Sequence, residues 1–155
     1  MPTGILVHGR HVEAEGWENL VWGKPPHKLG SLPTMVLEVL NTLHQSEIVI
    51  VLGTGASEKH GLKEAAYTRR YLSSRFDHLK DFSAIRNHPE LRTVTMSMDE
   101  AGLIFQWPGP AFEEPHPVQV KCKIVCEMKS QNTVQEIENA AAIFAAYDVG
   151  RVVQI

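Results

Sequence analysis

The chain has 155 residues, of which 43% are hydrophobic, enough for one domain with a sizeable core. Its formal net charge of -3 comes from interspersed acids and bases, which argues against a surface built for nucleic acid or an anionic membrane. The N-terminus lacks the pattern of a secretory signal, and no segment approaches the ~18 apolar residues of a membrane span. We therefore expect a single cytoplasmic domain over residues 1–155.

Short apolar runs alternate with amphipathic segments along the chain. The apolar runs are rich in β-branched residues and stop at glycine or polar residues, whereas the longer segments have apolar residues at helical spacing. The pattern predicts, in chain order, a strand at 4–8, a helix at 31–43, a strand at 48–52, a helix at 62–73, a strand at 119–127, a helix at 133–147 and a strand at 150–155.

This alternation favours an α/β fold, a Rossmann-like three-layer sandwich with a mostly parallel sheet and right-handed crossovers. Residues 76–118 interrupt the rhythm and are too long for an ordinary connection of ~2 to 6 residues. We expect an elaboration there, with a helix near 83–86 or 98–101 and a short strand at 103–107. Its aromatic residues, Phe105, Trp107 and Phe112, are candidates to cover the sheet.

Two features are expected to be structural. Cys122 and Cys126 fall on one face of a strand, and they lack the CxxC or Cys/His spacing of a metal or redox site. Trp17 and Trp22 are expected to pack a loop against the sheet edge rather than stack on a base. Glu13, Glu15 and His11 match no established ligand spacing, so no metal site is predicted, and the cofactor is unknown.

Candidate functional side chains follow three of the predicted strands. Because ligands of open α/β sheets bind at the carboxyl ends of the strands, these positions are well placed for chemistry. They are His8, Gly9 and Arg10 after the first strand, Gly53, Thr54, Gly55 and Ser57 after the second, and Glu127, Ser130, Asn132, Thr133 and Asn139 after the third, with Glu64 at the start of a helix.

Each group has a functional and a structural interpretation. The N–H groups of the 53–57 turn can hold a phosphate or carboxylate, or the turn is a plain connection with Ser57 as a cap. Glu127 can act as a base or ligand contact, or its carboxylate caps the backbone of Asn132 or Thr133. For Thr133 we favour a helix N-cap, with Glu136 completing a capping box.

The chain resembles the ElyC/SanA/YdcF family, whose members are largely of unknown function. The resemblance rests on the apolar strand closing in Gly9, the glycine pair at Gly53 and Gly55, the acid–alanine pair Glu64-Ala65, and the motif that runs from Glu127 through Ser130, Asn132 and Thr133 to Glu138, Asn139 and Ala140. It covers nearly the whole chain apart from 76–118. The family continues into a Thr-Ser loop with His and Arg, and this sequence does not contain that portion.

The resemblance implies a small-molecule-binding domain. As an enzyme it would act on a phosphorylated, nucleotide-derived or sugar-containing ligand, with Glu127, Glu64 and Asn132 as catalytic residues and the glycine turn holding an anion. The alternative is a non-catalytic binding or assembly domain, because the family's His and Arg are missing here. Whether the protein is an enzyme stays open, and the expected partners are an anionic small molecule and a second copy of the chain, without nucleic acid or membrane.

Overall fold

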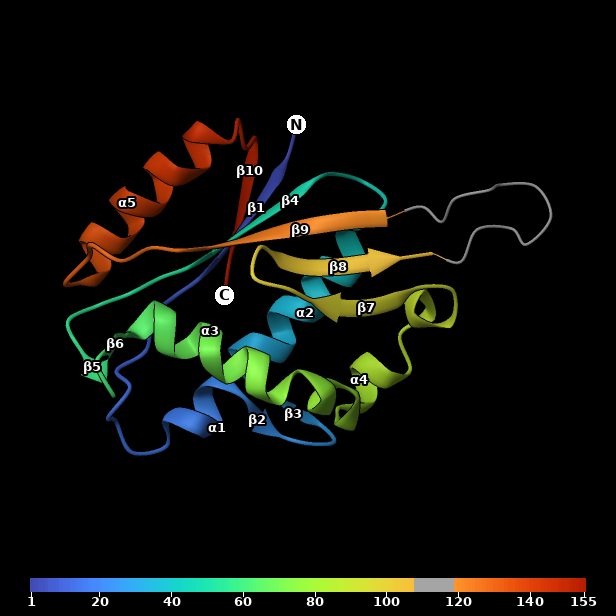
Figure 1. Cartoon of the computed structure of the whole chain (residues 1–155), viewed down its shortest axis with the longest axis horizontal. Helices are drawn as coiled ribbons and strands as arrows, with labels where there is room; N and C mark the ends of the chain where they lie inside the picture. The colour runs from blue at the N-terminus through green and yellow to red at the C-terminus, as the bar shows by residue number, and fades with distance from the viewer. Residues whose placement is uncertain (108–118) are drawn as a thin grey trace.

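The computed structural model describes residues 1–107 and 119–155 as an α/β fold around a six-stranded, mostly parallel sheet (Figure 1). In spatial order the strands are β10 (Arg151–Gln154), β1 (Thr3–Val7), β4 (Ile48–Leu52), β9 (Gln119–Cys126), β8 (Gly102–Gln106) and β7 (Thr95–Met98). The first four are parallel, whereas β8 and β7 are antiparallel to their neighbours. The carboxyl ends of β1, β4 and β9 therefore share one edge of the sheet.

The helices lie on both sides of this sheet (Figure 1). One side carries α1 (Trp17–Val21), α2 (Ser31–Thr42), α3 (Glu64–Arg75) and α4 (Ser83–Arg86), and the other carries α5 (Thr133–Ala146). Two 3-10 helices, η1 (Phe76–Asp81) and η2 (Pro89–Arg92), flank α4. Two short hairpins complete the described elements, β2 (Gly23–Lys24) with β3 (Lys28–Leu29), and β5 (Glu58–Lys59) with β6 (Leu62–Lys63).

Side-chain alternation along β1 and β4 builds two cores. Ile5 and Ile50 face the larger core beneath α2 and α3, whereas Leu6 and Val51 pack with Phe144 of α5. Both strands are buried on both faces, which explains why they read as continuous apolar runs rather than alternating ones.

Strand β9 is half-buried, and its sequence alternates accordingly. Cys122 and Ile124 belong to the larger core, whereas Lys121 and Lys123 are exposed. Cys126 packs against the same core, so the predicted structural role of both cysteines is confirmed. Trp17 and Trp22 are buried and contact Tyr71 of α3 edge-on, which confirms a packing role, although this partner belongs to a helix and not to the edge of the sheet.

The predicted elaboration contributes two strands to the sheet. The predicted helix at 83–86 is α4 and the strand at 103–107 is β8, but the alternative helix at 98–101 is wrong, because strand β7 ends at Met98 and a turn follows. Phe105 is fully buried in the core. Phe112 lies outside the described residues. Helix α1 and the two hairpins were not predicted, because each is shorter than the window over which periodicity can be recognised.

Candidate functional site at the carboxyl edge of the sheet

The ends of three strands are in register at one edge of the sheet. Val7 pairs with Leu52, and Leu52 pairs with Cys126, so that the chain leaves all three strands at the same level. The Gly53 N–H donates to Val7 and the Glu127 N–H donates to Leu52, which extends the ladder by one step. The segments that follow these three strands therefore start side by side.

The side chain of Glu136 reaches this edge from α5. One carboxylate oxygen contacts Nδ1 of His8, and the other accepts a hydrogen bond from the Gly9 N–H at 2.8 Å. Nε2 of His8 lies 2.8 Å from Oε1 of Gln154 in β10. His8 thus joins α5 to β10, and Glu136 as a residue is only 3% exposed.

Positions 9 and 53 must be glycine, because the carboxylates of Glu64 and Glu136 occupy the space that a side chain would need. A Cβ built on Gly9 would lie 2.6 Å from Oε1 of Glu64 and 3.0 Å from Oε2 of Glu136. Glu64 reaches this Cβ position from α3 and Glu136 reaches it from α5, so the two carboxylates lie close to each other. At Gly53 a Cβ would lie 2.2 Å from Glu136. Any side chain at either position would displace a carboxylate.

The turn after β4 is held by Glu64 from within the chain. Ser57 donates its N–H to Oε2 of Glu64 at 3.1 Å, and the Ser57 hydroxyl contacts the same oxygen. That hydroxyl accepts the Val12 N–H at 3.1 Å, and the Thr54 hydroxyl accepts the Ala65 N–H at 3.3 Å. The Ser57 N–H, which we expected to face an external anion, is directed at the protein's own carboxylate.

Glu127 has one satisfied and one unsatisfied carboxylate oxygen. Oε1 accepts the N–H groups of Lys129 at 2.6 Å and Ser130 at 3.1 Å. Oε2 is buried and has no hydrogen-bond partner among the described residues, and the whole residue is only 2% exposed. The structural interpretation, in which this carboxylate caps backbone N–H groups, is therefore confirmed in part. The capped groups belong to Lys129 and Ser130, whereas the sequence predicted Asn132 or Thr133. A buried unpaired carboxylate oxygen is costly, so it marks a position that calls for a donor.

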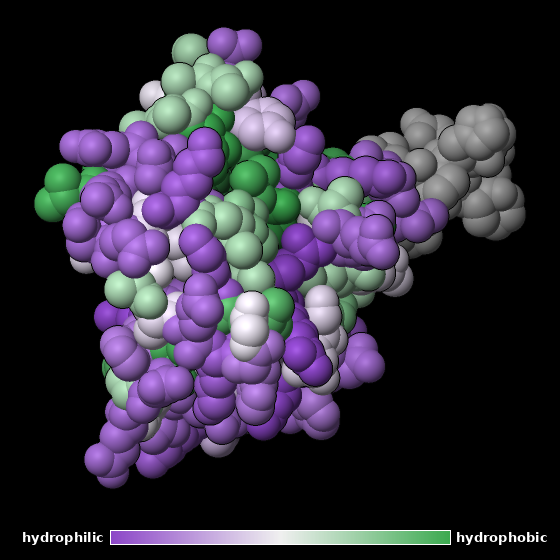
Figure 2. Space-filling model, turned by 60° about the vertical axis from the view of Figure 1, so that its left-hand side comes forward, coloured by the Kyte–Doolittle hydropathy of each residue, from purple (hydrophilic) through white to green (hydrophobic). Residues whose placement is uncertain are grey.

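A cavity of about 400 Å³ adjoins Glu127, between the end of β9 and α5. Ser130, which is fully buried, accepts a hydrogen bond from Nδ2 of Asn139 at 2.9 Å and so fixes the side chain of Asn139. The lining residues are Cys126, Glu127, Met128, Lys129, Asn139, Ala142, Ile143 and Ala146. On the face that carries α5, hydrophobic residues gather within a mostly hydrophilic surface (Figure 2). The cavity is large enough for a small ligand.

The start of α5 differs from the prediction. Asn132 is the N-cap, and its side chain accepts the Gln135 N–H at 2.9 Å. The predicted capping box of Thr133 and Glu136 is wrong, because Glu136 points away from the helix start to Gly9. Asn132 and Thr133 are both exposed, and neither lines the cavity beside Glu127. Arg10 is also exposed, and within the described residues its side chain forms no salt bridge with the carboxylates.

Two site residues were missed by sequence reasoning, Glu136 and Gln154. For Glu136 a signal exists: it lies four residues before Ala140 and eight before Phe144, which are both buried, so helical periodicity places its side chain on the inward face of α5. For Gln154 the sequence gives no signal, because only the pairing of β10 with β1 brings it to His8.

The two cysteine thiols are poor candidates for the reactive group. Burial raises the pKa of the Cys122 thiol to about 12 and also raises the pKa of Cys126, which lines the cavity. Both thiols are thus neutral and weakly nucleophilic near neutral pH. Within residues 1–107 and 119–155, no group of three His, Cys, Asp or Glu side chains is arranged to hold a metal ion. The same residues include no helix with the length and apolarity needed to cross a bilayer.

Comparisons with protein-family models, with curated proteins and with solved structures find no match to this chain.

Proposed function

We propose that the protein binds a small molecule in the cavity between β9 and α5, at the carboxyl edge of the sheet. The observation that carries this proposal is the buried Oε2 of Glu127, which has no partner within the described residues. Its neighbour Oε1 is held by two N–H groups, so the carboxylate is fixed with Oε2 left without a donor. A ligand hydroxyl or amine would supply the missing donor.

The lining of the cavity suggests the rest of the ligand. Lys129 contributes a cationic group that suits a phosphate or carboxylate, and Ile143 and Met128 contribute apolar surface. A sugar-containing or nucleotide-derived molecule combines hydroxyl donors, an anionic end and an apolar part. This class agrees with the proposed membership of the ElyC/SanA/YdcF family, with a Rossmann-like three-layer arrangement and a cytoplasmic location.

In an enzyme of this kind Glu127 would be the base. A ligand hydroxyl placed at Oε2 would pass its proton to that oxygen, while the Lys129 and Ser130 N–H groups hold the other oxygen in place. Asn139, fixed by Ser130, would orient the ligand. Glu64 would support the edge through Ser57 rather than contact the ligand.

A non-catalytic binding domain is the second candidate. It is favoured by the engagement of Glu64 and Glu136 with groups of their own chain, which leaves Glu127 as the carboxylate with an unpaired buried oxygen in the described residues. A single carboxylate suffices for binding, whereas acid–base catalysis commonly uses a second group.

A thermal-shift screen with nucleotides, sugar phosphates and S-adenosylmethionine tests the proposal. A ligand at 100 times its dissociation constant should stabilise the protein by about 2.7 kcal/mol. Glu127→Gln should abolish this shift and leave the unliganded protein folded, whereas Glu138→Gln, an exposed change on α5, should retain it. An unchanged shift in Glu127→Gln would disprove the site. Product formation from a binding ligand, absent in Glu127→Gln, would separate the enzyme from the binding domain.

A further inference from the structure

Strand β7 lies at one end of the sheet. It is the last strand of the sheet, and no other strand of the described residues pairs with its outer side. The Asp99 N–H donates to Gly102, and hydrogen-bonded residues alternate in an antiparallel pair, so Thr95 and Ser97 bond to β8. Met96 and Met98 consequently direct their backbone N–H and C=O groups outward.

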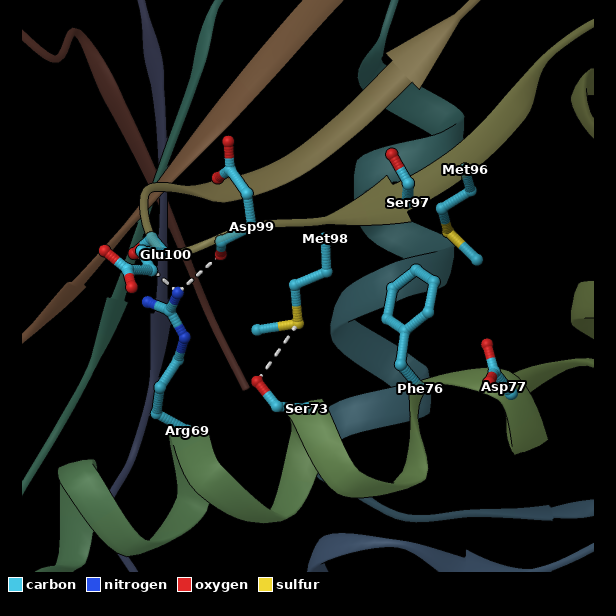
Figure 3. A pocket seen from close by; sticks show the side chains of 9 residues that line it. All are labelled: Arg69, Ser73, Phe76, Asp77, Met96, Ser97, Met98, Asp99 and Glu100. Atoms are coloured by element: carbon cyan, nitrogen blue, oxygen red, sulfur yellow. Dashed lines mark hydrogen bonds between the residues drawn. The ribbon is translucent and has the colours of Figure 1, made fainter.

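A groove runs between this edge and α3. It encloses about 550 Å³, and Figure 3 shows Met98 pointing from the strand toward Ser73, with Phe76 rising from the end of the helix. The Ser73 hydroxyl lies 3.7 Å from the sulfur of Met98. At one end Arg69 donates to the carbonyls of Asp99 at 2.8 Å and Glu100 at 2.6 Å, which ties the helix to the turn after β7. Met98, Ser73 and Phe76 therefore line the groove, and the hydrogen bonds of Arg69 hold one end of it in place.

The four-residue strand β7 contains neither Lys nor Pro, two residue types that protect an edge strand. Natural sheets guard exposed edges with Lys, Pro, bulges or covering segments. Residues 95–98 read Thr-Met-Ser-Met, and their pairing with β8 is regular without a bulge. The opposite edge, β10, carries the charged Arg151. An unprotected edge beside a groove is the arrangement with which domains bind extended peptides.

The charge around the groove selects its occupant. Asp77, Asp99 and Glu100 line it with exposed carboxylates, and Arg69 is already engaged by two carbonyls. One oxygen of Asp99 accepts backbone N–H groups of its own turn, which leaves its other oxygen and the carboxylates of Asp77 and Glu100 for the bound chain. The rim therefore favours Lys or Arg on the bound chain. Methionine is unbranched and adaptable, so Met96 and Met98 can accommodate apolar side chains of different shape.

We propose that β7 and α3 bind an extended peptide segment of a partner protein, which adds to the sheet beside β7. Its backbone pairs with the outward groups of Met96 and Met98, its apolar side chains enter the groove beside Phe76, and its alternate Lys or Arg side chains meet the acidic rim. A second copy of β7 is a poorer occupant, because Thr95–Met98 contains no basic residue. This surface is separate from the cavity beside Glu127, and the proposal does not depend on the proposed function.

The test uses a fluorescein-labelled decapeptide of alternating valine and lysine, with fluorescence anisotropy as the readout. We expect saturable binding, and at least a tenfold loss of affinity when glutamate replaces lysine. The same peptide N-methylated at alternate residues should also lose at least tenfold, because its backbone can no longer pair with the strand. This comparison uses the unaltered protein, so it is independent of how any variant folds.

Two variants of Met98 separate backbone pairing from side-chain contact. Met98→Pro removes an outward N–H that β8 does not use, so the sheet should persist by circular dichroism while peptide affinity falls at least tenfold. Met98→Ala keeps the backbone N–H, so its peptide affinity should fall less than that of Met98→Pro. Absence of binding, equal affinity for the N-methylated peptide, or equal affinity in Met98→Pro would each overturn the proposal. So would a dimer that forms through β7 and is abolished by Met98→Pro.

Discussion

The carboxylate of Glu136 occupies the space in which a side chain at position 53 would lie. A Cβ on Gly53 would approach Oε2 of Glu136 to 2.2 Å, closer than any real contact of this kind. Glu136 is far from Gly53 in the sequence, and the two meet because α5 packs against β4. The glycine that follows the second predicted strand and the acid on the inward face of α5 are thus required by the same contact.

Gly53→Ala should therefore destabilise the protein by about 1–3 kcal/mol, because the methyl group forces Glu136 out of its contacts with Gly9 and His8. Gly55→Ala is the matched control. Its Cβ would lie 3.0 Å from Glu64, a contact that a small shift relieves, and it should cost less. Urea denaturation measures both. In a Glu136→Ala background the two alanine substitutions should cost similar amounts, and a persistent gap would show that Glu136 is not the cause.

Asn132→Ala should lower the free energy of unfolding by about 1 kcal/mol, because it removes the side-chain acceptor for the Gln135 N–H at the start of α5. Thr133→Ala, one residue further, should change the free energy of unfolding by only a few tenths of this amount, since within the described residues its hydroxyl makes no cap hydrogen bond. The two variants can be compared by urea denaturation at neutral pH. A larger loss in Thr133→Ala would restore the capping box that the sequence predicted.

The stability of the protein should fall as pH rises above 9. Burial raises the pKa of the Cys122 thiol from 9.0 to about 12, so its neutral form is retained in the folded state while the unfolded thiol ionises. The stabilisation that this pKa difference gives to the folded state is complete below pH 9 and is lost between pH 9 and 12. Over that range the free energy of unfolding should fall by up to about 1.4 kcal/mol per pH unit for one thiol.

The Cys122→Ala variant tests this pH dependence. It should lose stability at neutral pH through its cavity, but its decline with pH should be shallower than in the parent chain. Cys126→Ala provides the comparison, because the pKa of Cys126 is raised by the same cause. Urea denaturation at neutral and at alkaline pH gives the slopes. Identical slopes in the parent chain and in Cys122→Ala would contradict the assignment.

Self-association is expected at residues 145–155, around the other edge of the sheet. Strand β10 pairs with β1 on one side only within the described residues, and Val152 is 42% exposed. A specific interface would bury at least ~1,000 Å² in total. Sedimentation at micromolar concentration should show a dimer that Val152→Lys disrupts, whereas Val134→Lys, an exposed change on α5, should leave it intact. A monomer at that concentration would reject this interface.

Local sequence pattern determined most elements of the main sheet and its long helices. Ile48–Leu52 has the bounds that its β-branched run predicts, and Thr133–Ala146 follows from apolar residues at helical spacing. Both patterns arise within a few residues of chain, because a strand or a helix buries whichever side chains its own period aligns. The sequence also identified Gly9, Gly53 and Glu127, because each directly follows or ends a predicted strand.

Tertiary structure alone decided how those residues meet. The contact of Gly9 with Glu136 spans 127 residues, and that of His8 with Gln154 spans 146, so each depends on the order in which the strands assemble. The same holds for β7, a strand that the sequence did not predict, since its state is fixed by pairing with β8. Periodicity says which face of an element turns inward. Only the packing of the elements says which donors and carboxylates then lie opposite one another, and which oxygen of Glu127 remains without a partner.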